Sequence, residues 1–346
     1  MFLRGPQRRI PCPRCDAVVT ERLPWADVGS VFTRDFEDVT AFFAQQTSKT
    51  VVGRIMKIAW PTVGNIIERA VARHGLPLAR RRLYHIGIDE ISYRKHHKYL
   101  TLVADHVSGE IVWGGEGKSG ETVDEFLDEL GPDGAASIDL VSMDMSQAFI
   151  AKVRQRLPNA TIVFDPFHVV KLANDAVDQV RRRQAHTLRP DDAAYVKRAR
   201  WVLLKAPENL LPHEHEKLSA LAVANRPLYR AYLLKEALRE MYRFAPERAA
   251  ARLVSWLAWA SRSRLAPFVR LARTIRQHRD GILAAIEHGL SNARLEGLNS
   301  KVRLLSHRAF GFHSADALLA LVFLCCSGIS IDLPSDRRPT SDPYTI

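Results

Sequence analysis

The run from which the fold can be predicted is Tyr84-His85-Ile86-Gly87-Ile88-Asp89-Glu90. Residues 84–90 are an apolar β-type stretch that ends in acidic side chains. A second run, residues 138–144, also ends in an aspartate. An acid just past an apolar strand stands at the edge of a sheet, where groups from several strands converge. We therefore predict that Asp89 and Asp144 end neighbouring strands. Alternation along a strand would point Glu90 the other way, towards the surface.

A mixed sheet is predicted around these acids. Strands are expected at about 84–89, 98–105, 110–114, 138–142 and 160–164. Helices are expected at 122–130, at 146–157 and from Pro166 onwards. Three antiparallel-type strands followed by alternating helices and strands is the order found in ribonuclease-H-like folds. The predicted fold class is therefore α/β, with the first part of a ribonuclease-H-like mixed-sheet core in residues 83–170.

The remainder of the chain after this core is predicted to be helical. Residues 171–288 show amphipathic helices and no strand pattern, which indicates a large all-α insertion. Its three tryptophans are expected in the core and not as platforms for bases: Trp201, Trp256 and Trp259. Residues 289–332 are expected to form the final core helices, and residues 333–346 a disordered tail. The helix carrying Glu296 has one apolar face, made by Leu298, Val302 and Leu305. Glu296, Asn299 and Arg303 share another face.

Residues 31–76 are predicted to form a helix-turn-helix region. Helical spacing begins after Thr33, a second helix begins at about Ser48, and Pro61 suits the first turn of a third. The apolar side of the second helix is expected to comprise Val51, Val52 and Ile55. The residues expected to contact DNA are Lys49, Arg54, Lys57, Thr62 and Asn65. A small three-helix packing unit with no such role is the alternative.

The 346-residue chain is strongly basic. Lys and Arg outnumber Asp and Glu by 50 to 38, a net charge of +12. Such a balance favours a polyanionic partner, either nucleic acid or an anionic membrane surface. The longest apolar run, residues 317–326, is too short to cross a bilayer, and no export leader is expected at the start of the chain. DNA is therefore the predicted partner, with no membrane.

The four cysteines form two pairs of different character. Cys325 and Cys326 are adjacent within an apolar run and are expected to be buried free thiols in a helix. Cys12 and Cys15 form a Cys-x-x-Cys knuckle within residues 1–30, a basic segment expected to be irregular. No pattern of a secreted disulfide framework is present, so a reducing cytoplasm is the expected location.

The acidic residues suit phosphodiester chemistry with a divalent metal. Carboxylates are preferred ligands of Mg²⁺, and two such ions would activate the attacking oxygen and stabilise the leaving one. We predict that Asp89, Asp144 and Glu296 hold two Mg²⁺ or Mn²⁺ ions. Three unrelated surface acids are the alternative. Asp165, followed by Pro166, is interpreted first as a helix N-cap, and His168 as a supporting residue near the site.

Several motifs together resemble those of ISL3-family transposases of bacterial insertion sequences. The stretches are Gly87-Ile88-Asp89-Glu90, Ser142-Met143-Asp144-Met145-Ser146, Asp165-Pro166-Phe167-His168, Leu295-Glu296-Gly297-Leu298-Asn299-Ser300-Lys301 and Arg308-Ala309-Phe310-Gly311-Phe312. The likeness covers about residues 12–330. It implies a DDE catalytic core in which Asp89, Asp144 and Glu296 are the metal-binding triad. Asp165 and His168 match a signature that follows the fifth strand in several DDE families.

The N-terminal segment departs from this family pattern. The resemblance implies a zinc module with two Cys-x-x-Cys knuckles, whereas only Cys12 and Cys15 are present. Two thiolates cannot complete a tetrahedral zinc site. Residues 1–30 are therefore expected to be a remnant of this module, with Cys12 and Cys15 as a partial zinc site. Either the chain is shortened, or His or Asp residues take the place of the missing cysteines.

The predicted function is that of a DDE transposase that binds terminal inverted repeats of its insertion sequence and target DNA. It would catalyse Mg²⁺-dependent strand cleavage and strand transfer, as a homo-oligomer on DNA in the bacterial cytoplasm, associated with the nucleoid. One alternative is a non-catalytic helix-turn-helix regulator or an inactive transposase remnant. Another is a ribonuclease-H-like nuclease of repair or recombination, which would cut by DNA structure and not at element ends.

Overall fold

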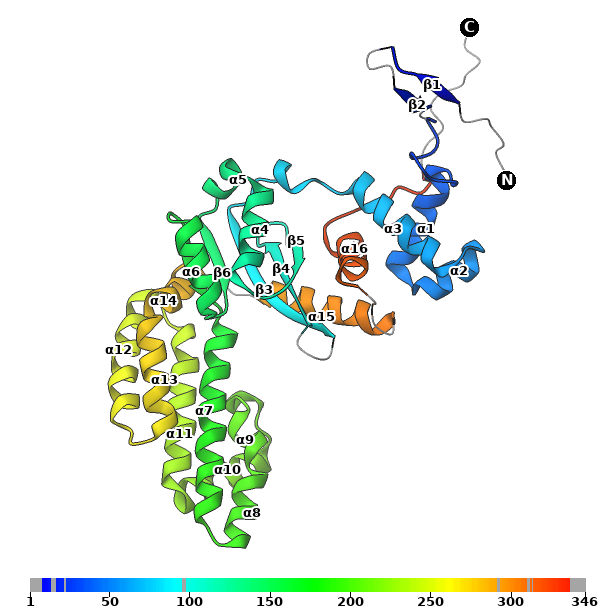
Figure 1. The fold of residues 1–346 in the computed structure, drawn as a ribbon. Helices are drawn as coiled ribbons and strands as arrows, with labels where there is room; N and C mark the ends of the chain where they lie inside the picture. Colours follow the sequence, from blue (N-terminus) through cyan, green and yellow to red (C-terminus); the bar gives the residue numbers. More distant parts are fainter. Residues whose placement is uncertain are drawn as a thin grey trace.

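The computed structural model describes residues 8–13, 17–21, 23–94, 98–290, 293–309, 312 and 314–336. An N-terminal hairpin and three helices lie at one end of the molecule, a sheet lies in the middle, and a long helical arm extends from its far side (Figure 1). The predicted tail lies mostly outside the described residues, which end at Asp336.

A short β-hairpin opens the described chain. Strands β1 (Arg9–Pro11) and β2 (Val18–Thr20) pair antiparallel. The prediction of an irregular segment over residues 1–30 was therefore wrong here. Pro11 is the last paired residue of β1, and proline is tolerated at the end of an edge strand because one side of that strand makes no hydrogen bonds.

Three helices follow, as the sequence pattern predicted: α1 (Arg34–Gln46), α2 (Lys49–Met56) and α3 (Trp60–His74). The side chains of Thr33 and Ser48 cap α1 and α2, and Pro61 occupies the first turn of α3. The predicted apolar side of α2 was wrong in part: Val52 is buried, whereas Val51 and Ile55 are exposed. A helix of eight residues that packs on α1 and α3 buries only a narrow stripe.

The linker after α3 forms a 3₁₀ turn, η1 (Leu78–Arg80), and leads into the sheet. Its elements are β3 (His85–Arg94), β4 (Lys98–Asp105), β5 (Ile111–Glu116), α4 (Gly120–Leu130), α5 (Pro132–Ala136), β6 (Leu140–Met143), α6 (Gln147–Arg156) and β7 (Thr161–Phe164). Among the described residues the strand order is β5-β4-β3-β6-β7, in which β6 and β7 run parallel to β3 and the other pairs are antiparallel. The predicted ribonuclease-H-like core, α/β with a helical insertion, is thus the observed fold.

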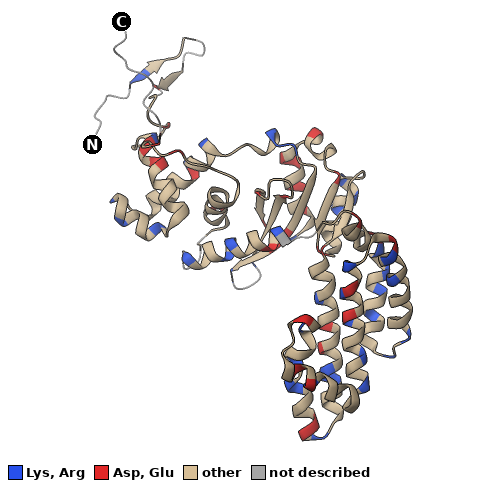
Figure 2. Ribbon diagram, turned by 180° about the vertical axis from the view of Figure 1, so that it is seen from behind, with Lys and Arg blue, Asp and Glu red and all other residues tan. Residues whose placement is uncertain are grey.

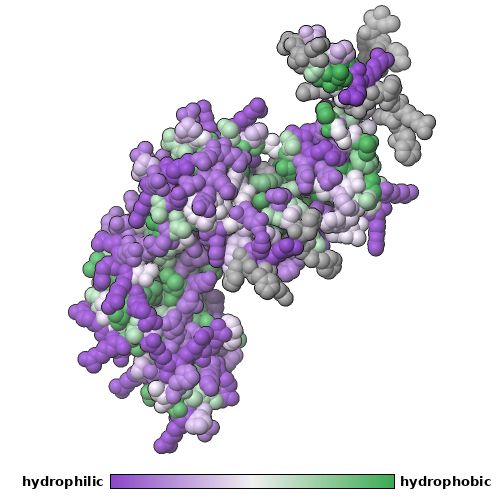
Figure 3. Space-filling model, viewed as in Figure 1, coloured by the Kyte–Doolittle hydropathy of each residue, from purple (hydrophilic) through white to green (hydrophobic). Residues whose placement is uncertain are grey.

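The helical arm begins with α7 (Pro166–Thr187), which follows β7 directly and runs unbroken out of the core. The arm continues with α8 (Pro190–Arg198), α9 (Arg200–Leu204), η2 (Pro207–Asn209), α10 (Pro212–Ala224), α11 (Arg226–Glu240), η3 (Met241–Arg243), α12 (Pro246–Arg262), α13 (Ala266–Gln277) and α14 (Arg279–Glu287). Helix α14 returns to pack on β7, so both ends of the arm are anchored at the sheet. Acidic and basic residues are interspersed along its helices (Figure 2), and the face seen in Figure 3 is mostly hydrophilic.

The tryptophans of the arm correct one prediction. Trp256 is buried and its indole N–H donates to the carbonyl of Leu234 at 2.8 Å, as expected for a core residue. Trp201 and Trp259 are 66% and 38% exposed, so their assignment to the core was wrong. The guanidinium of Arg200 lies over the Trp201 ring at 4.9 Å, and this cation–π contact stabilises the indole at the surface.

Helices α15 (Ala293–Arg308) and α16 (Ala315–Cys326) complete the core on the second face of the sheet. One large apolar cluster lies between one face of the sheet, α4, α6 and the arm. A second large cluster lies on the opposite face and joins β3 and β4 to α15, α16 and the three N-terminal helices. Cys325 and Cys326 are free thiols at the end of α16, as predicted; Cys326 is buried as expected, whereas Cys325 is half-buried. Of the helices that the structure describes, none has the length and apolar character needed to cross a bilayer.

Candidate active site

The register of two parallel strands brings Asp89 and Asp144 together. Gly87 of β3 pairs with Ser142 of β6, and each aspartate lies two residues further along its own strand direction. Both side chains therefore project from the same face of the sheet. The prediction that Asp89 ends its strand was wrong: β3 continues to Arg94, because its hairpin with β4 extends beyond the last residue of β6.

The carboxylate of Asp89 is held by two hydrogen bonds. The backbone N–H of Glu90 donates to Oδ1 at 2.8 Å, and the side-chain amide of Asn299 donates to Oδ2 at 2.6 Å. Burial nevertheless raises the pKa of Asp89, with the negative charge of Asp144 adding to the effect. The nearby His168 acts in the opposite direction. Asp144 accepts a bond from the backbone N–H of Ser146 at 2.8 Å, which orients its side chain at the start of the loop before α6.

Glu90 corrects a further prediction. Strand alternation places it opposite to Asp89, but it is half-buried and lines the same cavity instead of pairing at the surface. The ladder between β3 and β6 ends at Gly87, so the edge of β3 beyond it borders the cavity and both side chains reach it. Burial, reinforced by the charges of Asp144 and Asp89, raises the pKa of Glu90 to about 7.

Helix α15 packs across β3 and carries Glu296 to this edge. Leu295, Val302 and Leu305 are buried, and Leu298 is partly buried against the same cluster, as the apolar face predicted. A Cβ on Gly87 would stand 2.5 Å from the side chain of Leu295, so glycine is what allows the helix to lie this close to the strand. At the first turn of α15, Arg294 donates to the carbonyl of His106 at 2.6 Å.

The three predicted acids line one polar cavity of about 710 Å³. Its lining comprises Asp89, Glu90, Asp144, Phe167, His168, Lys171, Glu296, Gly297, Asn299, Ser300 and Arg303. Glu296 is exposed at its margin, whereas Asp89 and Asp144 are half-buried. Within the described residues, no three His, Cys, Asp or Glu side chains converge closely enough to form a ready-made metal cage. The acids therefore share a cavity without closing on a common point.

Asp165 is the N-cap of α7, as predicted from its sequence. It is buried, its Oδ1 accepts from the backbone N–H of Phe167 at 3.4 Å, and Pro166 occupies the first helical position. Its other oxygen lies 3.9 Å from Nε2 of His168. His168 lines the cavity and contacts Asp165. It is also near enough to Asp89 to act against the rise in the pKa of that carboxyl. The cap thus fixes the helical turn that presents His168.

The residues expected to contact DNA are placed unequally. Arg54, Lys57 and Asn65 are exposed, and Thr62 is half-buried. Lys49 is 6% exposed, which overturns its assignment to the DNA-contacting surface. Its ammonium lies over the rings of Trp60 at 5.0 Å and Phe312 at 5.5 Å, and burial lowers its pKa. The start of α2 packs against the rest of the protein. The hydrophobic period of one short helix does not predict which side will be covered in this way.

Cys12, the first cysteine of the Cys-x-x-Cys knuckle, directly follows β1. The backbone N–H of Cys12 donates to the carbonyl of Ala17 at 2.8 Å, which extends the hairpin towards the turn. Cys15 lies outside the described residues, so the partial zinc site stays a prediction.

Asn299 and Arg303 were already expected on the same helix face as Glu296, whereas Lys171 was not singled out in the sequence. Each of them has a recognisable signal there. Asn299 is one turn after Glu296, and Arg303 is one further turn along the same face. Lys171 is one turn after Phe167 and His168 on α7. Residues three or four apart on a helix share a face, so each acid or histidine of the site predicts its helical neighbours as cavity residues.

Comparison with known proteins assigns the chain to a class and then to a family. A family model described as a transposase, of the ISL3 DDE type, matches residues 86–322, and the helix-turn-helix domain of transposase family ISL3 matches residues 21–71. The chain is therefore a transposase by class. It belongs to the ISL3 family, which implies the use of divalent metal ions, and it contains that family's helix-turn-helix DNA-binding domain.

Two similar proteins illustrate the relationship. The chain is 40% identical, over 358 residues, to the transposase for insertion sequence element IS1557 of Mycobacterium tuberculosis, covering 96% of this chain and 80% of that one. It is 30% identical, over 322 residues, to the transposase for insertion sequence element IS1001 of Bordetella parapertussis, covering 91% and 79%.

Proposed function

We propose that the protein cuts DNA at the terminal inverted repeats of its own insertion sequence and joins the freed 3′ ends to target DNA, with Asp89, Asp144 and Glu296 as the metal-binding catalytic acids. The observation that carries the proposal is that these three residues, remote in sequence, line one cavity. The alternative of three unrelated surface acids does not account for that convergence.

The donor set in the cavity fits a divalent cation. Carboxylates gather there in surroundings that raise the pKa of Asp89 and Glu90, and a bound cation would offset their mutual repulsion. Mg²⁺ or Mn²⁺ bound by Asp89, Asp144 and Glu296 would supply Lewis-acid activation for phosphodiester cleavage and transfer. No covalent bond between protein and DNA is required for this chemistry.

The chain's own groups contribute orientation. Asn299 fixes one oxygen of Asp89, and Ser146 fixes one oxygen of Asp144, so these carboxylates keep their directions before substrate arrives. Glu296 is exposed at the start of a helix whose apolar face packs on β3, and it lines the same cavity as the aspartates.

End recognition is assigned to α2 and α3. Arg54 and Lys57 are exposed for phosphate contacts, and Asn65 is exposed for a base edge. This part of the molecule lies on the far side of α16 from the sheet (Figure 1), so recognition and cutting use separate surfaces of one chain.

The test is strand cleavage of duplex DNA carrying the junction between the element's end and its flanking DNA. The variants are Asp89→Asn, Asp144→Asn and Glu296→Gln, and Asp133→Asn, which alters an exposed acid on α5, is the matched control. Each site variant is expected to cut at least 100-fold more slowly, on the order of a lost catalytic group, while binding the same DNA in Ca²⁺. A site variant that cuts like the wild type removes that residue from the triad. Binding without cutting by the wild type in Mg²⁺ supports the regulator instead.

A further inference from the structure

Phe167 is an exposed aromatic side chain at the margin of a cavity whose other lining groups are almost all polar. It is 51% exposed, although it lies two residues after the buried Asp165 and two residues before the buried Val169. An isolated exposed phenylalanine is ordinary on a protein surface. Phe167 differs because it lines the same cavity as Asp89 and Asp144.

The ring of Phe167 is held in place before any ligand binds. Pro166 fixes the first helical position of α7, and Asp165 caps the N–H of Phe167 itself. The ring meets the imidazole of His168 edge to face, with centroids 5.4 Å apart and planes at 85°. An edge-to-face contact of this kind is a favourable geometry for an aromatic pair and leaves a ring face available.

Two basic side chains border the same cavity. Lys171 lies one turn after Phe167 on α7, and Arg303 lies on α15. Both are exposed, and among the described residues the structure records no ion pair for either. The cavity thus combines half-buried carboxylates with exposed basic side chains that can contact a phosphate backbone.

We propose that Phe167 is a positioning residue that stacks on a base displaced from the DNA helix beside the scissile phosphate, while Lys171 contacts the phosphate of that nucleotide. This inference rests on the proposed cleavage function. The π-face of a phenylalanine accepts any of the four bases, so the contact gives position and not sequence. The substrate class is accordingly DNA in which one nucleotide at the cleavage site is unpaired or easily unpaired.

The energetic consequence is specific to the pairing state of the DNA. Taking a base out of a duplex is unfavourable, and least so when the base is mismatched. Stacking on an aromatic side chain offsets part of that cost. Loss of the ring should therefore impair cutting of fully paired DNA more than cutting of DNA that carries a mismatch at the same position.

The first readout is cleavage. Phe167→Ala is expected to cut the paired junction duplex about 5- to 150-fold more slowly, the range that corresponds to one lost stacking contact. A mismatch beside the cleavage site is expected to restore most of that loss, and Phe167→Trp to cut like the wild type. Tyr84→Ala, which removes an exposed aromatic ring at the other end of β3, is the matched control and is expected to have no effect.

The second readout does not depend on cutting. Duplexes carry 2-aminopurine at successive positions across the junction, and binding is measured in Ca²⁺. The fluorophore is expected to brighten at one position as it leaves the base stack, with wild type and with Asp144→Asn, but not with Phe167→Ala. Equal brightening with Phe167→Ala, or none at any position with the wild type, overturns the stacking role. Brightening that depends on Phe167, together with undiminished cutting by Asp144→Asn, overturns the catalytic triad and leaves the stacking role standing.

Discussion

At the scale of single residues, the candidate site combines oriented and electrostatically strained carboxylates. Asp89 is bonded to Asn299 and to the backbone N–H of Glu90, whereas no hydrogen bond is recorded for the Glu90 side chain among the described residues, and its pKa rises to about 7. Asp89 and Glu90 are adjacent in sequence yet differ in what stabilises their charges. Partners, and not residue type, decide which of two neighbouring acids is easily ionised.

Glu90→Gln is expected to stabilise the metal-free protein at high pH. The folded-state pKa of Glu90, about 7, lies above its ordinary value of 4.5, so folding favours the protonated carboxyl. The contribution of the protonated Glu90 carboxyl to the free energy of unfolding is fully present below pH 4.5, and it is lost as the pH rises through 7. In EDTA at pH 8 the free energy of unfolding of the variant is expected to be about 1 kcal/mol larger than that of the wild type. Solvent screening makes this difference smaller than the pKa shift alone would give.

The measurement is denaturant unfolding at pH 8 and at pH 4, followed in the β-sheet core. The gain at pH 8 should disappear at pH 4, where the wild-type carboxyl is protonated as well. Glu125→Gln, at an exposed glutamate of α4, is the control and should give no difference at either pH. Equal stability of Glu90→Gln and wild type at pH 8 would show that Glu90 ionises freely in the folded protein.

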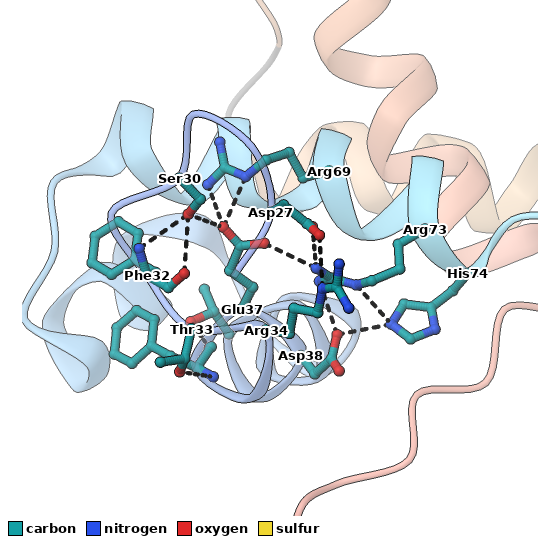
Figure 4. A network of polar contacts seen from close by, with 12 residues as sticks. Asp27, Ser30, Phe32, Thr33, Arg34, Glu37, Asp38, Arg69, Arg73 and His74 are labelled. Carbon is teal, nitrogen blue, oxygen red and sulfur yellow. Dashed lines mark hydrogen bonds and ion pairs between the residues drawn. The ribbon is translucent and has the colours of Figure 1, made fainter. Parts of the chain in front are cut away.

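At the scale of elements, the three N-terminal helices are joined by buried charges. Glu37 and Asp38 of α1 are almost fully buried and face Arg69, Arg73 and His74 of α3 (Figure 4). Arg73 bonds Glu37 at 3.2 Å and Asp38 at 3.0 Å, and it also pairs with Asp27 from the segment before α1. This network therefore sets the angle at which α1 supports α3.

Arg73→Ala is expected to destabilise the helix-turn-helix region by about 3–5 kcal/mol, because it removes the arginine that bonds both buried carboxylates, Glu37 and Asp38. Hydrogen exchange of the α1 and α3 amides measures this locally, with the amides of α7 as an internal reference. Arg54→Ala, at an exposed position of α2, is the control and should stay within about 0.5 kcal/mol of the wild type. Unchanged protection in Arg73→Ala would mean that apolar packing alone holds the two helices together.

At the scale of the whole molecule, α15 connects the helix-turn-helix region to the candidate site. Glu296 lies in its first turn, and Arg308 at its last residue donates to the carbonyls of Ala44 at 3.0 Å and Gln45 at 3.3 Å, at the end of α1. Helix α1 has no basic residue in its own last turn, so Arg308 supplies the cation that suits this helix end. Gln45 in turn donates to the carbonyl of Leu324 at 2.8 Å, in α16.

Arg308→Ala is expected to loosen this connection and to weaken protection of the last turn of α1 by about 1.5–3 kcal/mol, the range for hydrogen bonds that involve a charged group. We also expect slower cutting of the junction duplex with unchanged affinity for it, because the DNA-contacting residues keep their own geometry. Arg80→Ala, an exposed arginine of the linker, is the control for both readouts. Reduced affinity with unchanged cutting of bound DNA would place Arg308 in recognition and not in coupling.

Local sequence patterns were enough to predict most of the elements and the fold class. The apolar periods predicted the helices α1 to α3, the sheet strands and the all-α arm, and the residues flanking the acids carried the likeness to the family. These features depend on neighbours within one or two turns or strands, so they can be inferred from local pattern.

Which side chains lie together in space depends on the packing of segments that are far apart in the chain. The length of β3 beyond Asp89, the turn of Glu90 into the cavity, the burial of Lys49 and the exposure of Trp201 all depend on where a distant segment ends or packs. Phe167 and Lys171 joined the candidate site for the same reason. Contacts between residues far apart in the chain leave no local period, because burial and register are set by the partner element and not by the element's own sequence.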